Sequence, residues 1–335
     1  MKKVLYILII IVNITFGQDV HFSQFSQTPL VINPGLTGNC TGEHRVGLNY
    51  REQGSFFTKG YVTSSAFYDG KYLNNQSKRK GYLGMGIVLI NDRAGDSRMG
   101  ITQVGVSFAY FMELIENQIF SLGFQGGFGQ RSVDYSNLRW DSQYSNDSYN
   151  INIPPEFASR NDSYIFPDVS AGITWQFKKD KYIKTMLGVS LHHINPIKLR
   201  YLDVGNEILD RKMLLHGNLQ YILKNTGATL IPSFLYERQG KLQEVLCGML
   251  VKLQISELNN AKKKIENYIS FGVYSRIKDS FIFTLVIGSK NTKVGFNYDF
   301  NSSALSRANN HRGAVEVSAV FNIPYKKRRK SSAML

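Results

Sequence analysis

Alternation of apolar and polar residues is the dominant pattern along the chain. From residue 169 to 177 every second residue is apolar, and Ser, Gly, Thr and Gln stand between them. A period of two predicts a strand with one apolar face. The pattern recurs and predicts about fourteen strands, at 43–52, 60–71, 80–91, 99–113, 117–131, 166–179, 182–193, 212–223, 227–239, 241–255, 264–277, 279–289, 290–300 and 313–323.

The two faces of these strands differ in a way that indicates a membrane protein. One face carries Phe, Tyr, Leu and Val, whereas the other carries Gly, Ser, Asn and Gln with scattered charges. A soluble sandwich packs its apolar faces inward and usually turns charged residues to water. An apolar outer face with a crowded polar interior is typical of a transmembrane barrel, so we predict an all-β, antiparallel transmembrane β-barrel.

The spacing between the predicted strands indicates how this barrel is oriented. Gaps after even-numbered strands include the short ones at 114–116 and 180–181, whereas gaps after odd-numbered strands include 132–165, 194–211 and 301–312. Bacterial barrels have short periplasmic turns and longer outer loops. The even strand count and this parity predict that both termini of the barrel chain lie in the periplasm.

The chain divides into four segments. Residues 1–17 combine Lys2 and Lys3 with an apolar run and small residues, which predicts a signal peptide with Gln18 as the first mature residue. Residues 18–42 form a short N-terminal periplasmic or luminal segment, residues 43–324 form the barrel, and residues 325–335 form a basic tail. After residue 17 no apolar stretch is long enough for a membrane helix.

Charge and cysteine content add little to this picture. The formal net charge of +15 suits anionic surfaces in general and does not single out nucleic acid, so we expect no nucleic-acid partner. Cys40 and Cys247 allow at most one bridge in a chain too long to need one, which favours unpaired thiols.

We find no pattern that predicts catalysis or a cofactor. His192 and His193 are adjacent on a predicted strand, so their side chains should point to opposite faces, one to the lumen and one to the barrel exterior, without sharing a metal. The glycines at 126, 127 and 129 lie inside an alternating strand and not before a helix, which disfavours a phosphate loop. No GxSxG occurs. We therefore predict no enzyme activity, no cofactor and no metal.

The long loop at 132–165 is a candidate contact surface. It is rich in Asn, Asp, Ser and Tyr, a composition that suits protein contacts because Tyr supplies rigid amphipathic area. A solvated loop over the barrel mouth is the alternative. Within this loop, Trp140, Tyr144 and Tyr149 are the residues that we expect to bind a partner, since hot spots concentrate in Tyr and Trp.

The segment FSQFSQTPLVINPGLTG at 22–38 is a second candidate site. Phe22 and Phe25 are three residues apart, so one helical turn would place both on the same side. Asn33 and Pro34, followed by Gly, predict a turn before the first strand. We hypothesise that the segment folds into or against the periplasmic mouth and narrows the lumen; a flexible leader is the alternative.

An ordered series of motifs resembles the PorP/SprF family of Bacteroidetes outer-membrane proteins. After the N-terminal stretch come VGLNYREQ, SSAFYDGKY, INDRAGDSRMG, FPDVSAGITWQF, LGVSLHHINPIK, IPSFLYERQGK, VGFNYDFNSSALS and GAVEVSAVF. The chain departs from the family at 313–316, where Gly-Ala-Val-Glu replaces the usual Gly-His-Glu, and in its basic tail. Positions that match are Phe22, Ser23, Gln24, Asn33, Pro34, Gly38, Tyr50, Arg51, Gln53, Tyr68, Asp69, Asp92, Gly95, Pro167, Asp168, His193, Tyr298 and Asp299.

The resemblance implies a non-enzymatic outer-membrane component of the type IX secretion system. Its implied partners are a secreted adhesin with a C-terminal sorting domain, other secretion components and outer-membrane lipid, and its implied role is export or surface anchoring of large adhesins in gliding motility. A channel for small solutes is the alternative, because a barrel of about fourteen strands encloses space unless something fills it. An outer-membrane hydrolase is disfavoured, because no nucleophile and base match.

Overall fold

The computed structural model describes residues 19–54, 60–72, 81–95, 99–133, 139–145, 148–154, 163–198, 208–257, 265–303 and 310–325. The predicted signal peptide and nearly all of the predicted basic tail lie outside these residues.

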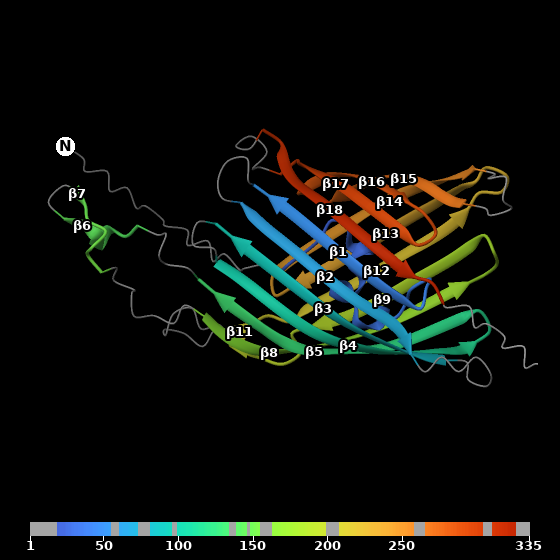
Figure 1. Ribbon diagram of the computed structural model, residues 1–335, viewed down its shortest axis with the longest axis horizontal. Coiled ribbons are helices and arrows are strands. Elements are labelled where there is room, and N and C mark those ends of the chain that lie inside the picture. The colour runs from blue at the N-terminus through green and yellow to red at the C-terminus, as the bar shows by residue number, and fades with distance from the viewer. Residues whose placement is uncertain are drawn as a thin grey trace, which may run out of the picture.

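Fourteen long strands form a closed antiparallel barrel (Figure 1). Each strand pairs with its neighbours along the chain, and β1 closes the barrel against β18, with His44 opposite Ile323. The predicted all-β barrel is therefore confirmed. Its strands are β1 (His44–Gln53), β2 (Tyr61–Tyr72), β3 (Gly81–Ala94), β4 (Met99–Ile115), β5 (Gln118–Ser132), β8 (Ser163–Lys178), β9 (Ile183–His192), β12 (Lys212–Ile222), β13 (Ala228–Gln239), β14 (Leu242–Glu257), β15 (Ile265–Arg276), β16 (Ser280–Gly288), β17 (Thr292–Asn301) and β18 (Arg312–Ile323).

The remaining elements are short. The long connections after β5 and β9 contain the two-stranded hairpins β6 (Tyr144–Ser145) with β7 (Ser148–Tyr149), and β10 (Ile197–Lys198) with β11 (Ile208–Leu209). A 3-10 turn, η3 (Asp141–Gln143), precedes β6. In Figure 1 the β6–β7 hairpin stands well away from the end of the barrel. Three further short elements precede β1: the 3-10 turn η1 (Phe25–Gln27), the one-turn α-helix α1 (Pro29–Ile32) and the 3-10 turn η2 (Pro34–Leu36).

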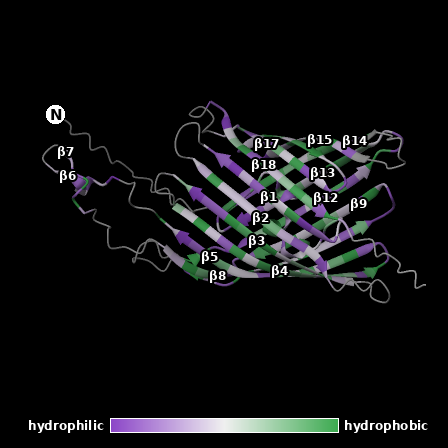
Figure 2. Cartoon of the chain, viewed as in Figure 1, coloured by the Kyte–Doolittle hydropathy of each residue, from purple (hydrophilic) through white to green (hydrophobic). Residues whose placement is uncertain are grey.

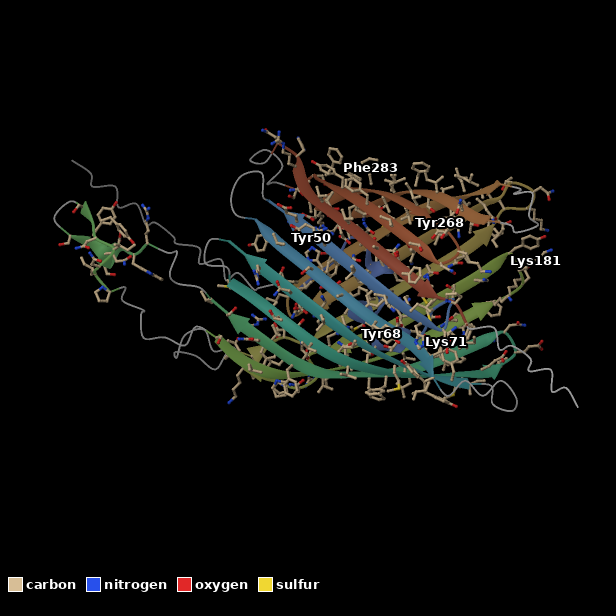
Figure 3. All side chains as sticks on the ribbon, in the orientation of Figure 1. Tyr50, Tyr68, Lys71, Lys181, Tyr268 and Phe283 are labelled. Atoms are coloured by element: carbon tan, nitrogen blue, oxygen red, sulfur yellow. The ribbon has the colours of Figure 1, made fainter. Side chains whose placement is uncertain are left out.

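The barrel wall has an apolar outer face and a polar inner face. Leu48 is 57% exposed and Phe128 is 65% exposed, whereas Ser107 and Glu316 have no exposed surface. Figure 2 shows hydropathy alternating along the strands, and in Figure 3 the side chain of Phe283 points away from the barrel. Because transmembrane barrels turn their apolar residues to lipid, this exposed apolar band is the membrane-facing surface.

No helix in the described parts of the chain is long and apolar enough to cross a membrane.

The two ends of the barrel differ in the length of their connections. At one end, which we call the turn end, β4 and β5 are joined by two residues and β16 and β17 by three. The other end, which we call the loop end, carries the long connections after β5 and β9. By the usual asymmetry of bacterial barrels the turn end faces the periplasm and the loop end faces outward. Strand β1 begins and β18 finishes at the turn end.

Candidate functional site

The described chain before β1, residues 19–43, lies inside the barrel. It contacts the inner faces of strands all around the wall: the Ser23 amide donates to Glu316 of β18 and the Gly38 amide donates to Asp69 of β2, while Ser121 of β5 donates to the Gly35 carbonyl. Only a segment within the lumen reaches strands this far apart in the sheet. We call residues 19–43 the luminal segment.

The luminal segment runs the length of the barrel. The Asp19 amide donates to Gln239 Oε1, 3.1 Å away at the loop end of β13. At its other end the Glu43 amide donates to the carbonyl of Ile323, 2.8 Å away at the turn end. The sequence predicted a segment that folds into or against the periplasmic mouth. The segment instead extends through the lumen, because its first described residue, Asp19, lies at the loop end.

At the loop end, a cluster of buried charges surrounds Asp19. His193 lies 3.0 Å from Asp19 through Nε2 and 3.0 Å from Asp168 through Nδ1. Lys212 Nζ donates to the Val20 carbonyl at 3.0 Å and pairs with Glu237 at 2.8 Å. Burial opposes the charge on His193, but the carboxylates of Asp19 and Asp168 overcome it and raise its pKa to about 9. Burial likewise opposes the charge on Asp19, yet His193 and Lys212 hold the pKa of its carboxyl below the usual range.

The prediction for the two adjacent histidines is wrong in one respect. Both side chains are buried within the lumen, because His193 follows the last residue of β9 and has a φ of 56°, which breaks the alternation of the strand. His192 Nε2 lies 3.2 Å from the Ile32 carbonyl, whereas His193 contacts Asp19. The residues that the structure describes contain no group of three potential ligands that could hold a metal.

Also toward the loop end, Glu316 of β18 receives the luminal segment. Its two carboxylate oxygens accept hydrogen bonds from the amides of Ser23, at 2.8 Å, and Gln24, at 2.9 Å. Arg51 pairs with Glu316 at 3.3 Å and with Asp299 at 3.0 Å, and also donates to Ser23 Oγ. These groups are buried, and each charge in the cluster has an opposite charge beside it. The departure from the family pattern before Glu316 therefore leaves this contact in place.

Asn33 fastens the luminal segment to β8, β9 and β12. Its Nδ2 donates to the carbonyls of Ile173 and Val189, both at 3.1 Å, and lies 3.0 Å from His216 Nε2. Its Oδ1 accepts from the Gly35 amide at 2.7 Å, which closes the turn into η2. A Cβ at Gly172 would stand 2.0 Å from Asn33 Oδ1, so only glycine allows this approach.

At the turn end, Asp69 holds the last part of the luminal segment. Its Oδ2 accepts from the Gly38 amide at 2.7 Å, and Arg45 pairs with the same carboxylate at 2.6 Å. Gly38 has a φ of 79° and packs against Gly84, where a Cβ on Gly38 would stand 2.6 Å from the Cα. Glycine at these two positions lets the segment pass close to β3.

The four residues singled out in this segment are all buried. Asn33 and Pro34 lie in the turn that faces β5 and β8. Phe22 packs in one apolar cluster with Leu30 and Phe67, whereas Phe25 packs in another with Leu246 and Tyr274. The two phenylalanines therefore do not share a side, because η1 begins only at Phe25.

The three residues singled out in the outer loop lie together around the β6–β7 hairpin. The rings of Tyr144 and Tyr149 are 6.0 Å apart, and Arg139 lies over the Tyr149 ring at 5.1 Å. Tyr149 donates from its hydroxyl to Gln143 Oε1 at 3.1 Å, and the Trp140 amide donates to the same oxygen. Tyr144 is 63% exposed, so the hairpin presents an aromatic side chain to its surroundings.

Sequence reasoning from local patterns missed the charged groups that hold the luminal segment. Arg276 of β15, which donates to Ser23 Oγ at 2.9 Å, and Glu316 were not singled out. The signal that could have found them was a charged residue on the polar face of a strand that otherwise carries Gly, Ser and Asn. The motif resemblance did mark several of their partners, including Ser23, Arg51 and Asp299.

Comparison with known proteins settles the family. A family model described as type IX secretion system membrane protein PorP/SprF matches residues 14–321, nearly the whole chain. The chain belongs to the PorP/SprF family. This PorP/SprF protein is thus an outer-membrane β-barrel associated with type IX secretion, and the resemblance drawn from its motifs is confirmed. No curated protein matches it in sequence.

Solved structures resemble this PorP/SprF protein only as barrels. CdiB from Acinetobacter baumannii is 9% identical with a TM-score of 0.44, over 84% of this chain and 60% of that one. A TodX monoaromatic hydrocarbon channel mutant is 8% identical with a TM-score of 0.45, over 88% and 93% of the two chains. The KdgM porin is 8% identical with a TM-score of 0.39, over 83% and 99%. Likeness at this level carries no argument about function.

Proposed function

We propose that this PorP/SprF protein is a non-enzymatic factor that assists the secretion or surface anchoring of large adhesins. Its partners in this proposal are a secreted adhesin with a C-terminal sorting domain and other type IX secretion components. The observation that carries the proposal is that one candidate site is buried in the lumen and the other is exposed outside it. The lumen is occupied by the luminal segment, whereas the β6–β7 hairpin offers an exposed aromatic surface at the loop end.

The adhesin contact is proposed to lie on the β6–β7 hairpin. A partner held at the cell surface needs contact area outside the membrane, and a stable contact buries around 800 Å² on each side. Short turns offer too little area, whereas the connection after β5 is long and carries Trp140, Tyr144 and Tyr149. Aromatic residues of this kind supply much of the binding energy at protein interfaces.

Replacement of the outer loop tests this contact. Residues 141–163 are exchanged for a short Gly-Ser linker, insertion of the barrel is confirmed, and adhesin is measured at the cell surface by immunolabelling. We expect labelling to fall sharply. Normal labelling would exclude the hairpin as the main docking site and direct attention to the luminal segment.

A solute channel remains the competing function, and liposome swelling separates the two. The paired charges around Ser23 and Asp19, which hold the luminal segment inside the barrel, support a blocked lumen. We therefore expect the purified protein to admit small sugars slowly. Rapid swelling by the unaltered protein would favour the channel.

A further inference from the structure

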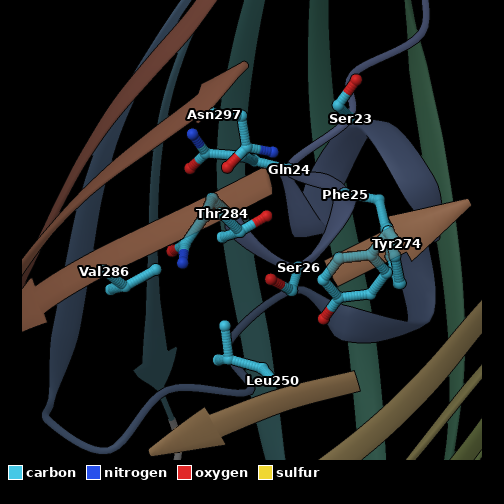
Figure 4. A pocket seen from close by; sticks show the side chains of 10 residues that line it. Ser23, Gln24, Phe25, Ser26, Leu250, Tyr274, Thr284, Val286 and Asn297 are labelled. Atoms are coloured by element: carbon cyan, nitrogen blue, oxygen red, sulfur yellow. The ribbon is translucent and has the colours of Figure 1, made fainter. Parts of the chain in front are cut away.

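The lumen offers little room for a ligand beside the turn η1. The pocket there is lined among others by Ser26, Leu250 and Thr284, and it has a volume of about 20 Å³ (Figure 4). That is room for a water molecule or two and for nothing larger. The outer rim of the barrel at the turn end differs, because positive charge gathers there.

Two neighbouring turns carry this charge. Lys179 and Lys181 lie between β8 and β9, and Lys224 lies between β12 and β13. The Ile222 amide donates to the Tyr182 carbonyl at 2.8 Å, which joins the two turns. All three lysines are exposed, and Figure 3 shows Lys181 at the end of the barrel. We call Lys179, Lys181, Tyr182 and Lys224 the basic rim.

Two lysines of the basic rim approach the same aromatic ring. Lys181 Nζ lies 5.0 Å from the centre of the Tyr182 ring, and Lys224 Nζ lies 5.1 Å from it. The two ammonium groups are thus separated by no more than about 10 Å, a distance over which charges still act on each other at 0.1 M salt. A negative charge beside Tyr182 would relieve the repulsion between them.

The carboxylate of these two turns is already engaged. Asp180 Oδ1 accepts hydrogen bonds from the amides of Tyr182, at 2.7 Å, and Ile183, at 2.9 Å. These bonds, with the charges of Lys179 and Lys224 nearby, hold the pKa of the Asp180 carboxyl below its ordinary value. No lysine of the basic rim forms an ion pair with a carboxylate of the described residues. The rim therefore has charge to offer to a ligand.

The membrane-facing surface ends directly beside the basic rim. Trp175 and Phe177 of β8 share an outward face with the exposed Ile173, and their rings stack with centroids 6.0 Å apart. Tyr221 of β12 is exposed three residues before Lys224. Transmembrane barrels carry aromatic residues where the apolar band meets the lipid headgroups. The basic rim thus lies at the level of the headgroups of the periplasmic leaflet.

Positive charge is spread around the turn end. In the sequence, the connections 73–80 and 258–264 each contain three basic residues and no acidic residue. The β4–β5 turn is an exception, with Glu116. A lipid leaflet surrounds the barrel and meets all of these connections at once, whereas one acidic segment of a protein does not. The distribution of charge therefore favours lipid over an acidic polypeptide.

We propose that the basic rim binds the phosphate of an anionic phospholipid in the periplasmic leaflet. The acyl chains of this lipid pack along Trp175, Phe177 and Tyr221, and its headgroup lies against the lysines. Lysines next to a membrane surface attract anionic headgroups in this way. This inference goes beyond the proposed function and does not depend on the adhesin contact at the β6–β7 hairpin, which lies at the opposite end.

Trp175 is a reporter for this lipid within the protein itself. The chain has two tryptophans, and the other, Trp140, lies beside the β6–β7 hairpin at the loop end. The full-length Trp140→Phe protein is reconstituted in phosphatidylcholine vesicles with a small, equal fraction of either brominated phosphatidylglycerol or brominated phosphatidylcholine. Bromine quenches the fluorescence of a tryptophan that it contacts. We expect brominated phosphatidylglycerol to quench Trp175 at least about twofold more strongly, because the lysines enrich it locally.

Two sets of substitutions locate the site. Joint Lys179→Gln, Lys181→Gln and Lys224→Gln substitution in the Trp140→Phe protein should remove the preference for phosphatidylglycerol. The matched control is joint substitution to Gln of the three lysines at 262–264, which takes the same charge from another connection at this end of the barrel. The control should keep the preference. Circular dichroism confirms that each variant is folded.

Four results would overturn the proposal. Equal quenching by the two brominated lipids would show that Trp175 has no preferred anionic neighbour, and equal loss of the preference in both lysine variants would assign it to the overall charge. Loss of the preference on addition of a soluble Gly-Asp hexapeptide would reassign the basic rim to acidic polypeptides. Loss on addition of inorganic phosphate, against chloride at matched ionic strength, would reassign it to small anions.

Discussion

The luminal segment and the β6–β7 hairpin are both short pieces of chain with several aromatic residues, yet they are held in opposite ways. The barrel wall holds the luminal segment through Glu316, Asp69 and the carbonyls next to Asn33. The hairpin is held by contacts within itself, between Gln143, Tyr149 and Arg139. A change in the luminal segment should therefore alter stability, whereas a change in the hairpin should alter only what it contacts.

Removal of the Glu316 carboxylate should have the largest effect. Glu316→Ala leaves Arg51 buried with one of its two carboxylates missing and frees the amides of Ser23 and Gln24. Loss of one partner from a buried ion pair costs about 3–5 kcal/mol. Hydrogen exchange of the peptide covering residues 19–28 measures this directly, and its protection should fall by that free energy.

Glu316→Gln is the matched control, because an amide keeps the shape and one acceptor. In Glu316→Gln, the protection of residues 19–28 against hydrogen exchange should lie between that of the parent and that of Glu316→Ala. Exchange in Glu316→Ala at the parent rate would contradict the role assigned to this carboxylate.

Raised pH should loosen the loop end of the luminal segment. The His193 pKa of about 9 lies above the usual value of 6.5, so its stabilisation is complete below pH 6.5 and is lost as pH rises through 9. A difference of this size corresponds to roughly 3 kcal/mol. The charged groups around His193 are Asp19 and Asp168, with Lys212 and Arg131 acting on Asp19.

Denaturant unfolding at pH 6 and pH 10 measures this effect, and His193→Gln is the control for other groups that titrate. The parent should lose more stability than His193→Gln between the two pH values. The same loss in both proteins would show that His193 does not fasten the segment.

Much of the barrel was predictable from the sequence because its two faces meet different surroundings. The predicted strand at 99–113 is β4 (Met99–Ile115), and the predicted strand at 212–223 is β12 (Lys212–Ile222). Lipid on one side and a polar lumen on the other impose a period of two, and the Gly, Ser, Asn and Gln on the luminal face distinguish it from the charged outer face of a soluble sheet.

The contacts of the luminal segment were not predictable in the same way. Ser23 and Glu316 are 293 residues apart in the chain, and no local pattern relates them. Backbone conformation also overrode the strand pattern at His193, where a positive φ turns the side chain into the lumen. The position of Asn33 in a turn was readable from its following Pro and Gly, but its bonds to two carbonyls of the wall were not.

Substitution of Asn33 should have a moderate effect on stability. Asn33→Ala removes hydrogen bonds to Ile173 and Val189 and the cap on Gly35, each worth about 1 kcal/mol, so a loss of about 2–3 kcal/mol is expected. Asn33→Asp should be worse at neutral pH, because a carboxylate then faces two carbonyl oxygens. Denaturant unfolding in micelles gives both values, and a more stable Asp variant would contradict this account of the contact.

Truncation of Tyr144 should have the smallest effect on stability and a clear effect on partner binding. Its ring is 63% exposed and meets only Tyr149 among the described ring contacts, so Tyr144→Ala should change the free energy of unfolding by no more than about 0.5 kcal/mol. If the adhesin docks on the hairpin, the same substitution should lower surface labelling, because exposed Tyr supplies binding energy at interfaces.

Tyr61 is 57% exposed on β2 at the same end of the barrel, and Tyr61→Ala is therefore the matched control. Equal labelling in both variants would remove Tyr144 from the contact, whereas a large loss of stability in Tyr144→Ala would show that the hairpin is held by more than its own contacts.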